Sequence, residues 1–277
     1  MQNISIKQLP SPSVVVDEEI VRRNCKKMID RSKQLGVAIR PHMKTHKTIE
    51  IGKFQVEGLE FKKVIVSTLQ EAKFYAQSGY FKDILYAIPI APNKLEQAAS
   101  IHSSIDVLHL MVDHPDHVRA LVDFRVSNNA ALAGKKWSVF VKIDCGYHRA
   151  GADPCSPKTL DLIASITKDN NQHFDFQGIY THSGHSYRQQ TPKEIAAIAL
   201  EEATVAGQMG ARIREAGLPC PIVSIGSTPS SDPAKPIDFS RYPIGTVIQI
   251  IPNHSCLTAA MFSNYQILKG ITLFELT

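Results

Sequence analysis

The chain has no block of basic residues, no long apolar run and no closely spaced pair of cysteines. Its 277 residues carry a formal net charge of only +5, and its aromatic side chains are not interleaved with Lys and Arg as in nucleic-acid-binding proteins. No apolar run approaches the roughly 20 residues of a membrane-spanning helix. The sequence therefore predicts no nucleic-acid or membrane partner, while its mild positive charge suits an anionic small ligand or cofactor.

The cysteines are not those of a disulfide-stabilised secreted protein. They are odd in number, form no CxxC motif and are not preceded by a signal peptide over residues 1–16. We therefore expect reduced thiols and a cytoplasmic location. The five positions are Cys25, Cys145, Cys155, Cys220 and Cys256.

What the sequence does contain is an alternation of short apolar runs and amphipathic helices. The runs are almost continuously apolar, as parallel strands covered by helices on both faces are. Eight such runs in about 230 residues favour a (β/α)8 TIM-like barrel over an open doubly wound sheet, which is the alternative α/β fold. The predicted strands are residues 13–16, 37–39, 63–67, 84–88, 107–112, 139–144, 176–180 and 221–225.

Polar motifs follow five of these strands at the point where each strand ends. The carboxyl ends of parallel strands meet at one edge of a sheet or barrel, where catalytic groups gather. We therefore expect one pocket at that edge. The motifs follow Ile39, Ser67, Asp144, Tyr180 and Ile225.

The first of these motifs, residues 40–47 (RPHMKTHK), places Lys44 just past a predicted strand. A lysine there either holds an anionic substrate as a cation or attacks a carbonyl as a neutral amine, forming a Schiff base. Its basic neighbours, which include His42 and His46, favour the neutral form. On charge alone, a solvated basic loop is the alternative.

The motif after the last predicted strand offers donors to a phosphate. Gly226, Ser227 and Thr228 supply backbone N–H groups and hydroxyls at the place where barrels bind phosphate. A tripeptide of this kind is more often a plain turn. Tyr180 and Tyr187 are likewise either pocket residues or half-buried packing residues.

Two further pairs have structural interpretations. His182 and His185 have no third ligand close by, so we expect them to line the pocket rather than to bind a metal. Asp144 and Arg149 are expected to form an internal ion pair that braces a loop.

Residues 40–47 closely resemble the cofactor-lysine motif of the eukaryotic D-serine dehydratase and D-threonine aldolase family, whose members are fold type III pyridoxal-phosphate enzymes related to alanine racemase. The resemblance covers most of the chain, and its first and last motifs are the most specific. The other matching motifs are STLQEA (67–72), DCGYHRAG (144–151), YTHSGHSY (180–187), GSTP (226–229) and PNHSC (252–256).

The resemblance implies a cofactor, pyridoxal 5'-phosphate, and the residues that hold it. In the family the lysine after Pro-His-x carries the cofactor as a Schiff base, which assigns that role to Lys44 rather than Lys47. The residues implied to contact the cofactor or its phosphate are Tyr180, Tyr187, Gly226, Ser227 and Thr228.

His254 and Cys256 match the metal-binding pair of the family. Residues two apart on a strand face the same side, and a thiolate with an imidazole suits Zn2+. The aldolase branch is expected to carry a carboxylate at the second position, so Cys256 favours the zinc-dependent dehydratase. Without the resemblance, a buried cysteine beside a turn histidine is the simpler interpretation.

The implied reaction is the zinc-assisted β-elimination of D-serine, or of a related D-3-hydroxyamino acid, to pyruvate and ammonia. Lys44 is the natural base for the α-proton, and zinc at His254 and Cys256 would help the β-hydroxyl to depart. Three alternatives stay open: a D-threonine aldolase-type lyase, a non-catalytic pyridoxal-phosphate-binding protein, and a phosphate-binding barrel without pyridoxal chemistry.

The chain departs from the family pattern after the barrel. Family members carry a second, all-β domain, whereas only 47 residues follow Ser230 here, which is near the lower bound of roughly 50 for a domain. We therefore predict a barrel over residues 1–230 and a truncated remnant of the β domain over residues 231–277. The family pairs two chains, which predicts a homodimer, and the shortened β segment weakens that expectation.

Overall fold

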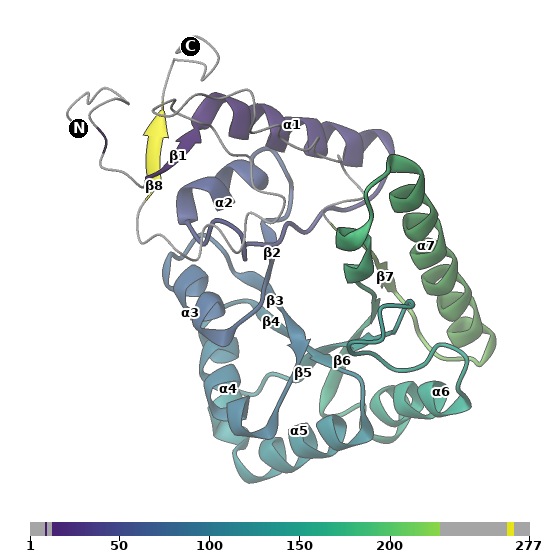
Figure 1. Ribbon diagram of the computed structural model, residues 1–277. Coiled ribbons are helices and arrows are strands. Elements are labelled where there is room, and N and C mark those ends of the chain that lie inside the picture. The colour runs from purple at the N-terminus through teal and green to yellow at the C-terminus, as the bar shows by residue number, and fades with distance from the viewer. Residues whose placement is uncertain (1–8, 10–12, 228–264, 269–277) are drawn as a thin grey trace. The chain divides into compact units, whose positions relative to one another are not determined.

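The computed structural model describes residue 9, residues 13–227 and residues 265–268 (Figure 1). These residues belong to two compact units, one made of residues 1–65 with 239–277 and the other of residues 66–238. The boundary falls within strand β2, Lys63–Val66.

The first unit contains a two-stranded parallel sheet and two helices. Strand β1 (Val14–Asp17) pairs with β8 (Tyr265–Leu268), and the helices are α1 (Glu18–Gln34) and α2 (Ile49–Gln55). Asp17 caps α1, because its side chain accepts a hydrogen bond of 3.0 Å from the backbone N–H of Ile20.

The predicted strand at residues 37–39 is wrong. These residues form no strand, and Val37 is 57% exposed. Pairing starts only at Pro41, whose carbonyl accepts from Ile65 N at 2.9 Å, and Met43 N then donates to Ile65 O at 2.8 Å. Met43 is buried in the interior. The apolar run at residues 37–39 is therefore only a connection between α1 and the pairing segment.

The second unit is built on a parallel sheet that curls along its length (Figure 1). The six-stranded sheet follows chain order, β2-β3-β4-β5-β6-β7, and the pairs from β3 onward are parallel. Its strands after β2 are β3 (Asp83–Pro89), β4 (Val107–Val112), β5 (Trp137–Lys142), β6 (Phe174–Tyr180) and β7 (Ile222–Ser224).

A helix or a longer helical segment connects each strand of this sheet to the next. The α-helices are α3 (Leu69–Gln77), α4 (Leu95–Ser104), α5 (Pro115–Ser127), α6 (Pro157–Ala164) and α7 (Pro192–Glu215). Short helical turns are η2 (Pro92–Lys94), η3 (Asn129–Leu132) and η5 (Gly184–Arg188), and α6 continues into a π-helical turn, η4 (Ser165–Asp169).

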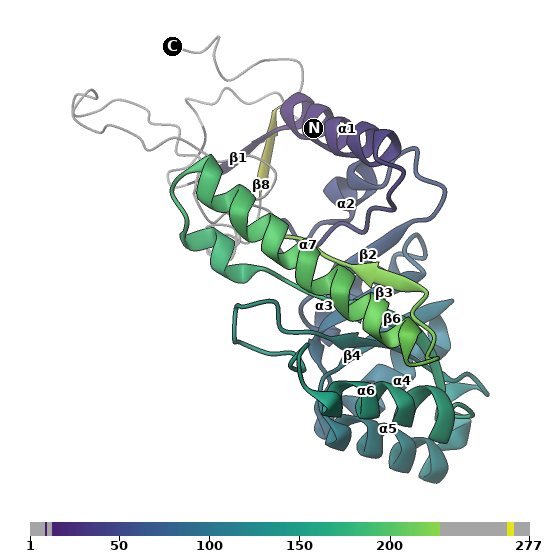
Figure 2. The ribbon, with the colours of Figure 1, turned by 90° about the vertical axis from the view of Figure 1, so that its right-hand side faces the viewer.

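The parallel α/β class predicted from the sequence is confirmed. The closed (β/α)8 barrel stays a prediction, because the described strands form a six-stranded sheet and a separate two-stranded pair. The long helix α7 begins with a capping box between Thr191 and Glu194. Figure 2 shows α7 from the side, where it packs along β6 and β7.

The core of the second unit lies on both faces of the sheet. Every residue of β5 is buried, as expected for a strand covered on both sides. Trp137 at its start is fully buried, and its indole N–H donates to the Leu121 carbonyl at 3.0 Å. Burying one large apolar side chain contributes about 1.5–3 kcal/mol, so β5 is a main source of stability for the edge that carries the polar loops.

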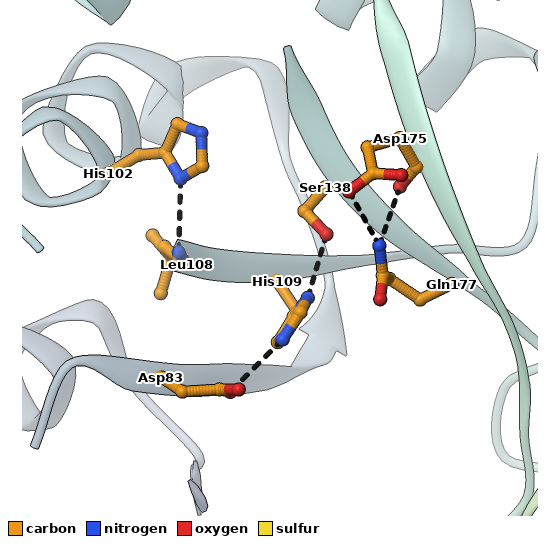
Figure 3. A network of polar contacts seen from close by, with 7 residues as sticks. All are labelled: Asp83, His102, Leu108, His109, Ser138, Asp175 and Gln177. Carbon is orange, nitrogen blue, oxygen red and sulfur yellow. Dashed lines mark hydrogen bonds and ion pairs between the residues drawn. The ribbon is translucent and has the colours of Figure 1, made fainter. Parts of the chain in front are cut away.

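A buried polar network holds the opposite, amino-terminal edge of the sheet (Figure 3). His109 contacts Ser138 Oγ through Nδ1 at 2.7 Å and Asp83 Oδ1 through Nε2 at 3.0 Å. The order Ser–His–Asp is that of a nucleophilic triad, but Ser138 is only 2% exposed. The network therefore ties β3, β4 and β5 together and is structural.

Candidate active site

In the first unit, hydrogen bonds to the backbone shape the loop that carries Lys44. Lys47 N donates to the Met43 carbonyl at 3.0 Å, closing one turn, and Lys47 itself has a left-handed φ of 51°. His42 Nδ1 accepts from the backbone N–H of Lys44 at 3.2 Å. Met43 is buried, and the half-buried Lys44 directly follows the segment, residues 41–43, that pairs with Ile65.

His46 fixes the far side of the same loop. Its ring accepts from Thr48 N through Nδ1 at 3.1 Å, so Nε2 carries the proton and donates to Gln55 Oε1 at 2.9 Å. Burial lowers the pKa of His46, although its hydrogen bonds act in the opposite direction. His46 therefore anchors the loop as a neutral ring, and the crowding of Lys44 by basic groups stays a prediction.

In the second unit, the loop after β5 is not braced by the predicted ion pair between Asp144 and Arg149. Asp144 accepts from the backbone N–H groups of Gly146 and His148, both at 3.0 Å, and from His148 Nδ1 at 2.8 Å. Burial raises the pKa of Asp144, but the hydrogen bonds from His148 and Gly146 outweigh it and hold the pKa below its usual value. Arg149 instead lies over the Tyr147 ring, 4.9 Å from its centroid.

Gly151 allows this loop to return to the sheet. Its N–H donates to Asp113 Oδ2 at 2.9 Å, and its φ is +123°. A Cβ at this position would lie 2.5 Å from Asp144 N, so a larger residue would displace the loop. Glycine here is required both by the backbone conformation and by the space.

Lys142, at the carboxyl end of β5, is a site residue that the sequence reasoning missed. It is only 4% exposed. Burial lowers its pKa, and Arg149 lowers it further, whereas Asp113 raises it. A charged residue that ends an otherwise apolar run was the available signal, because buried lysines are rare outside functional sites.

The segment after β6 and the turn after β7 meet at one buried carboxylate, Glu202 of α7. Its Oε1 accepts from Thr181 Oγ1 at 2.8 Å and from Gly226 N at 3.2 Å, and its Oε2 accepts from Ser183 Oγ at 2.7 Å. Nothing in the sequence marked this residue, which looks like an ordinary helical glutamate.

Hydroxyl groups cluster beside this carboxylate. Ser227 Oγ lies 2.8 Å from Ser186 Oγ and 3.2 Å from Ser183 Oγ, and both Ser183 and Ser186 are buried. The turn is further fixed by His182, whose Nδ1 lies 3.0 Å from the Gly226 carbonyl. Gly226 has a φ of +142°. Its turn and the hydroxyls of Ser183, Ser186 and Ser227 together form what we call the polar cradle, which is suited to a phosphate group.

Aromatic rings lie beside this cradle. His182 lies 6.4 Å from Tyr187 and 6.5 Å from Tyr147 between ring centroids, and His185 stacks on Tyr147 at 5.9 Å. Tyr180 is buried at the end of β6. The prediction that the two histidines serve as lining rather than as metal ligands stays a prediction, and among the described residues no group of three or more His, Cys, Asp or Glu could hold a metal.

The predicted site residues fall into three groups. Tyr180, Tyr187, Gly226 and Ser227 lie in the second unit, at the carboxyl ends of β6 and β7. Lys44 lies in the first unit. Thr228, His254 and Cys256 lie outside the residues that the structure describes.

Comparison with known proteins identifies the family. Residues 16–242 match the model of the alanine racemase N-terminal domain, and residues 225–268 match that of a putative serine dehydratase domain. The D-serine dehydratase of Dictyostelium discoideum is 39% identical over 97% of this chain and 95% of its own length. The chain belongs to the D-serine dehydratase family.

Other members of the family differ from this chain in length. The D-serine dehydratase of Schizosaccharomyces pombe is 33% identical over 94% of this chain and 66% of its own length. The alignment with the Dictyostelium protein runs over 380 positions, over a hundred more than the 277 residues of this chain. More than a hundred positions of that alignment therefore have no residue here.

Solved structures give the same fold. D-threo-3-hydroxyaspartate dehydratase, solved as a metal-free cysteine-to-alanine mutant, has a TM-score of 0.73 and 32% identity over 82% of this chain and 58% of that chain. Alanine racemase of Clostridium difficile, at 18% identity and a TM-score of 0.60, shows the fold alone. Within the described residues, no helix is both long and apolar enough to cross a membrane.

Proposed function

We propose that this protein is a pyridoxal-phosphate-dependent lyase that converts D-serine to pyruvate and ammonia with the help of zinc. The observation that carries the proposal is the 39% identity to a D-serine dehydratase over 97% of the chain. The polar cradle of Ser183, Ser186, Ser227 and Gly226 supports it, because it offers hydroxyl donors and a glycine turn where the cofactor phosphate is expected.

The roles of the residues follow from their chemistry. The cradle holds the phosphate, Tyr180 and Tyr187 contact the cofactor, and Lys44 is the amine to which the cofactor is joined. When bound, the cofactor ring withdraws electrons and stabilises negative charge at the substrate α-carbon. As a free amine, Lys44 Nζ would take the α-proton of the substrate.

We place the zinc ion at His254 and Cys256. A thiolate and an imidazole two residues apart suit Zn2+, and a zinc ion polarises a hydroxyl and so helps it leave. The metal-free form of the related D-threo-3-hydroxyaspartate dehydratase was a cysteine-to-alanine mutant, which supports a cysteine as a metal ligand in this chain. Burial raises the pKa of Cys145 to about 11, so that thiol is a poor competitor for the metal.

Turnover of D-serine tests this function. We expect the purified protein to release pyruvate from D-serine and not from L-serine, and to lose that activity on treatment with a chelator. Added zinc should restore it. The measurement is pyruvate release coupled to lactate dehydrogenase, and activity that persists at full rate after complete metal removal would contradict the role of zinc.

A non-catalytic pyridoxal-phosphate-binding protein is the second candidate. It is favoured by one observation: more than a hundred aligned positions of the Dictyostelium enzyme have no residue in this chain. Cofactor binding without pyruvate release, with and without zinc, would establish this second function. Release of glycine and acetaldehyde from D-threonine would instead identify an aldolase.

A further inference from the structure

Glu202 is a buried carboxylate on which two loops of the site depend. It lies on α7 and is 2% exposed, and its three donors are Thr181 Oγ1, Ser183 Oγ and Gly226 N. Thr181 and Ser183 follow β6, and Gly226 follows β7. One carboxylate therefore fixes the distance between the two segments that form the polar cradle.

These hydrogen bonds are what make the burial of Glu202 tolerable. A carboxylate taken out of water without partners is strongly destabilising. Of the Lys and Arg side chains that the structure describes, none forms an ion pair with Glu202. The donors to this carboxylate among the described residues are all neutral, and the carboxylate sets their orientation.

The carboxylate also decides which hydroxyl hydrogens remain for a ligand. Ser183 has one hydroxyl hydrogen, and the 2.7 Å contact with Glu202 takes it because a carboxylate is the stronger acceptor. The longer 3.2 Å contact from Ser183 Oγ to Ser227 Oγ competes for that same hydrogen and is the weaker of the two. Ser186 Oγ and Ser227 Oγ lie 2.8 Å apart and either can be the donor in that contact, so these two hydroxyls, and not Ser183, are the ones that could turn a hydrogen toward an anion.

We propose that Glu202 is a positioning residue for the phosphate of the cofactor. It does not touch the phosphate; it holds Gly226 and Ser183 so that the Ser186 and Ser227 hydroxyls donate to the phosphate oxygens. This inference rests on the proposed function, because it takes the cradle to be the phosphate site. It predicts that Glu202 matters for the phosphorylated cofactor and not for its dephosphorylated form.

The test compares pyridoxal 5'-phosphate with pyridoxal, which lacks the phosphate. Dissociation constants for both are measured by absorbance titration of cofactor-free protein, in the wild type and in Glu202→Ala and Glu202→Gln. We expect Glu202→Ala to weaken pyridoxal 5'-phosphate about tenfold or more, the scale of a lost charged hydrogen bond, and to leave pyridoxal unchanged. Glu202→Gln keeps one oxygen acceptor and should fall between the two.

Matched variants keep the test independent of folding. Glu215→Gln changes an exposed glutamate of the same helix and should alter neither constant. Thr181→Val removes one donor to Glu202 without changing side-chain shape, and it should reduce the preference for the phosphorylated form in the same direction even where Glu202→Ala does not fold.

Two results would overturn the inference, and they are distinguishable. A wild type that binds pyridoxal 5'-phosphate no more tightly than pyridoxal would overturn the phosphate site and the role of Glu202 with it. A wild type that prefers the phosphorylated form, with variants that keep the full preference or weaken both ligands equally, would overturn the role of Glu202 alone.

Discussion

Buried histidines fix local geometry in both units through hydrogen bonds that need a neutral ring. His46 holds the Lys44 loop against Gln55. In the second unit His102 Nδ1 accepts from Leu108 N at 3.0 Å (Figure 3). Its Nε2 donates to the Lys136 carbonyl at 2.9 Å. The sequence motif predicted the importance of Lys44, but it suggested charge for His46, because spacing alone does not show that a ring is buried and paired.

His102 makes stability depend on pH. Burial lowers its pKa to about 4, whereas in the unfolded chain it is about 6.5. Between these values the unfolded chain binds a proton that the folded protein does not, so stability falls as pH falls from 6.5 toward 4, by up to about 1.4 kcal/mol per pH unit. Urea unfolding at pH 7.5 and pH 5 measures this loss.

Variants separate His102 from other groups that titrate. In His102→Gln, which retains a donor and an acceptor, the part of the loss due to His102 should disappear. His114→Asn, an exposed position where Asn keeps the cap of α5, should leave the loss unchanged. An equal pH dependence in wild type and His102→Gln would refute the assignment.

At the scale of the element, apolar runs predicted that strands exist better than they predicted where each strand begins and ends. Strand β4 was predicted in full, whereas β5 was predicted at residues 139–144, two residues late at each end; the apolar runs of both strands are buried. The run at residues 37–39 is also apolar but lies before the pairing segment, and the buried residue is Met43. Three apolar residues do not specify which part of a loop a neighbouring strand will bind.

The loop after β5 gives a test at this scale. Gly151 and Gly134 both have positive φ, at 123° and 79°, but only at Gly151 would a Cβ meet backbone atoms. Gly134→Ala should cost about 1–2 kcal/mol from the left-handed backbone alone, and Gly151→Ala should cost clearly more. Thermal and urea unfolding measure both, and equal losses would show that the loop can move without cost.

At the scale of the whole molecule, the alternation of strands and helices predicted the parallel α/β class, and the motifs predicted the family. The position of Glu202 was not predictable, because its three donors come from segments separated from it by roughly 20 residues along the chain and meet it only in the folded sheet. Long-range polar contacts of this kind have no local sequence signal.

The covalent link between Lys44 and the cofactor is the central claim, and reduction with borohydride followed by peptide mapping tests it most directly. We expect the pyridoxyl phosphate label on Lys44, its loss in Lys44→Ala, and its retention in the control Lys47→Arg. Lys142 is the sharpest competitor, because it is buried and its pKa is lowered. A label on Lys142, or on no lysine of a protein incubated with the cofactor, would contradict the account.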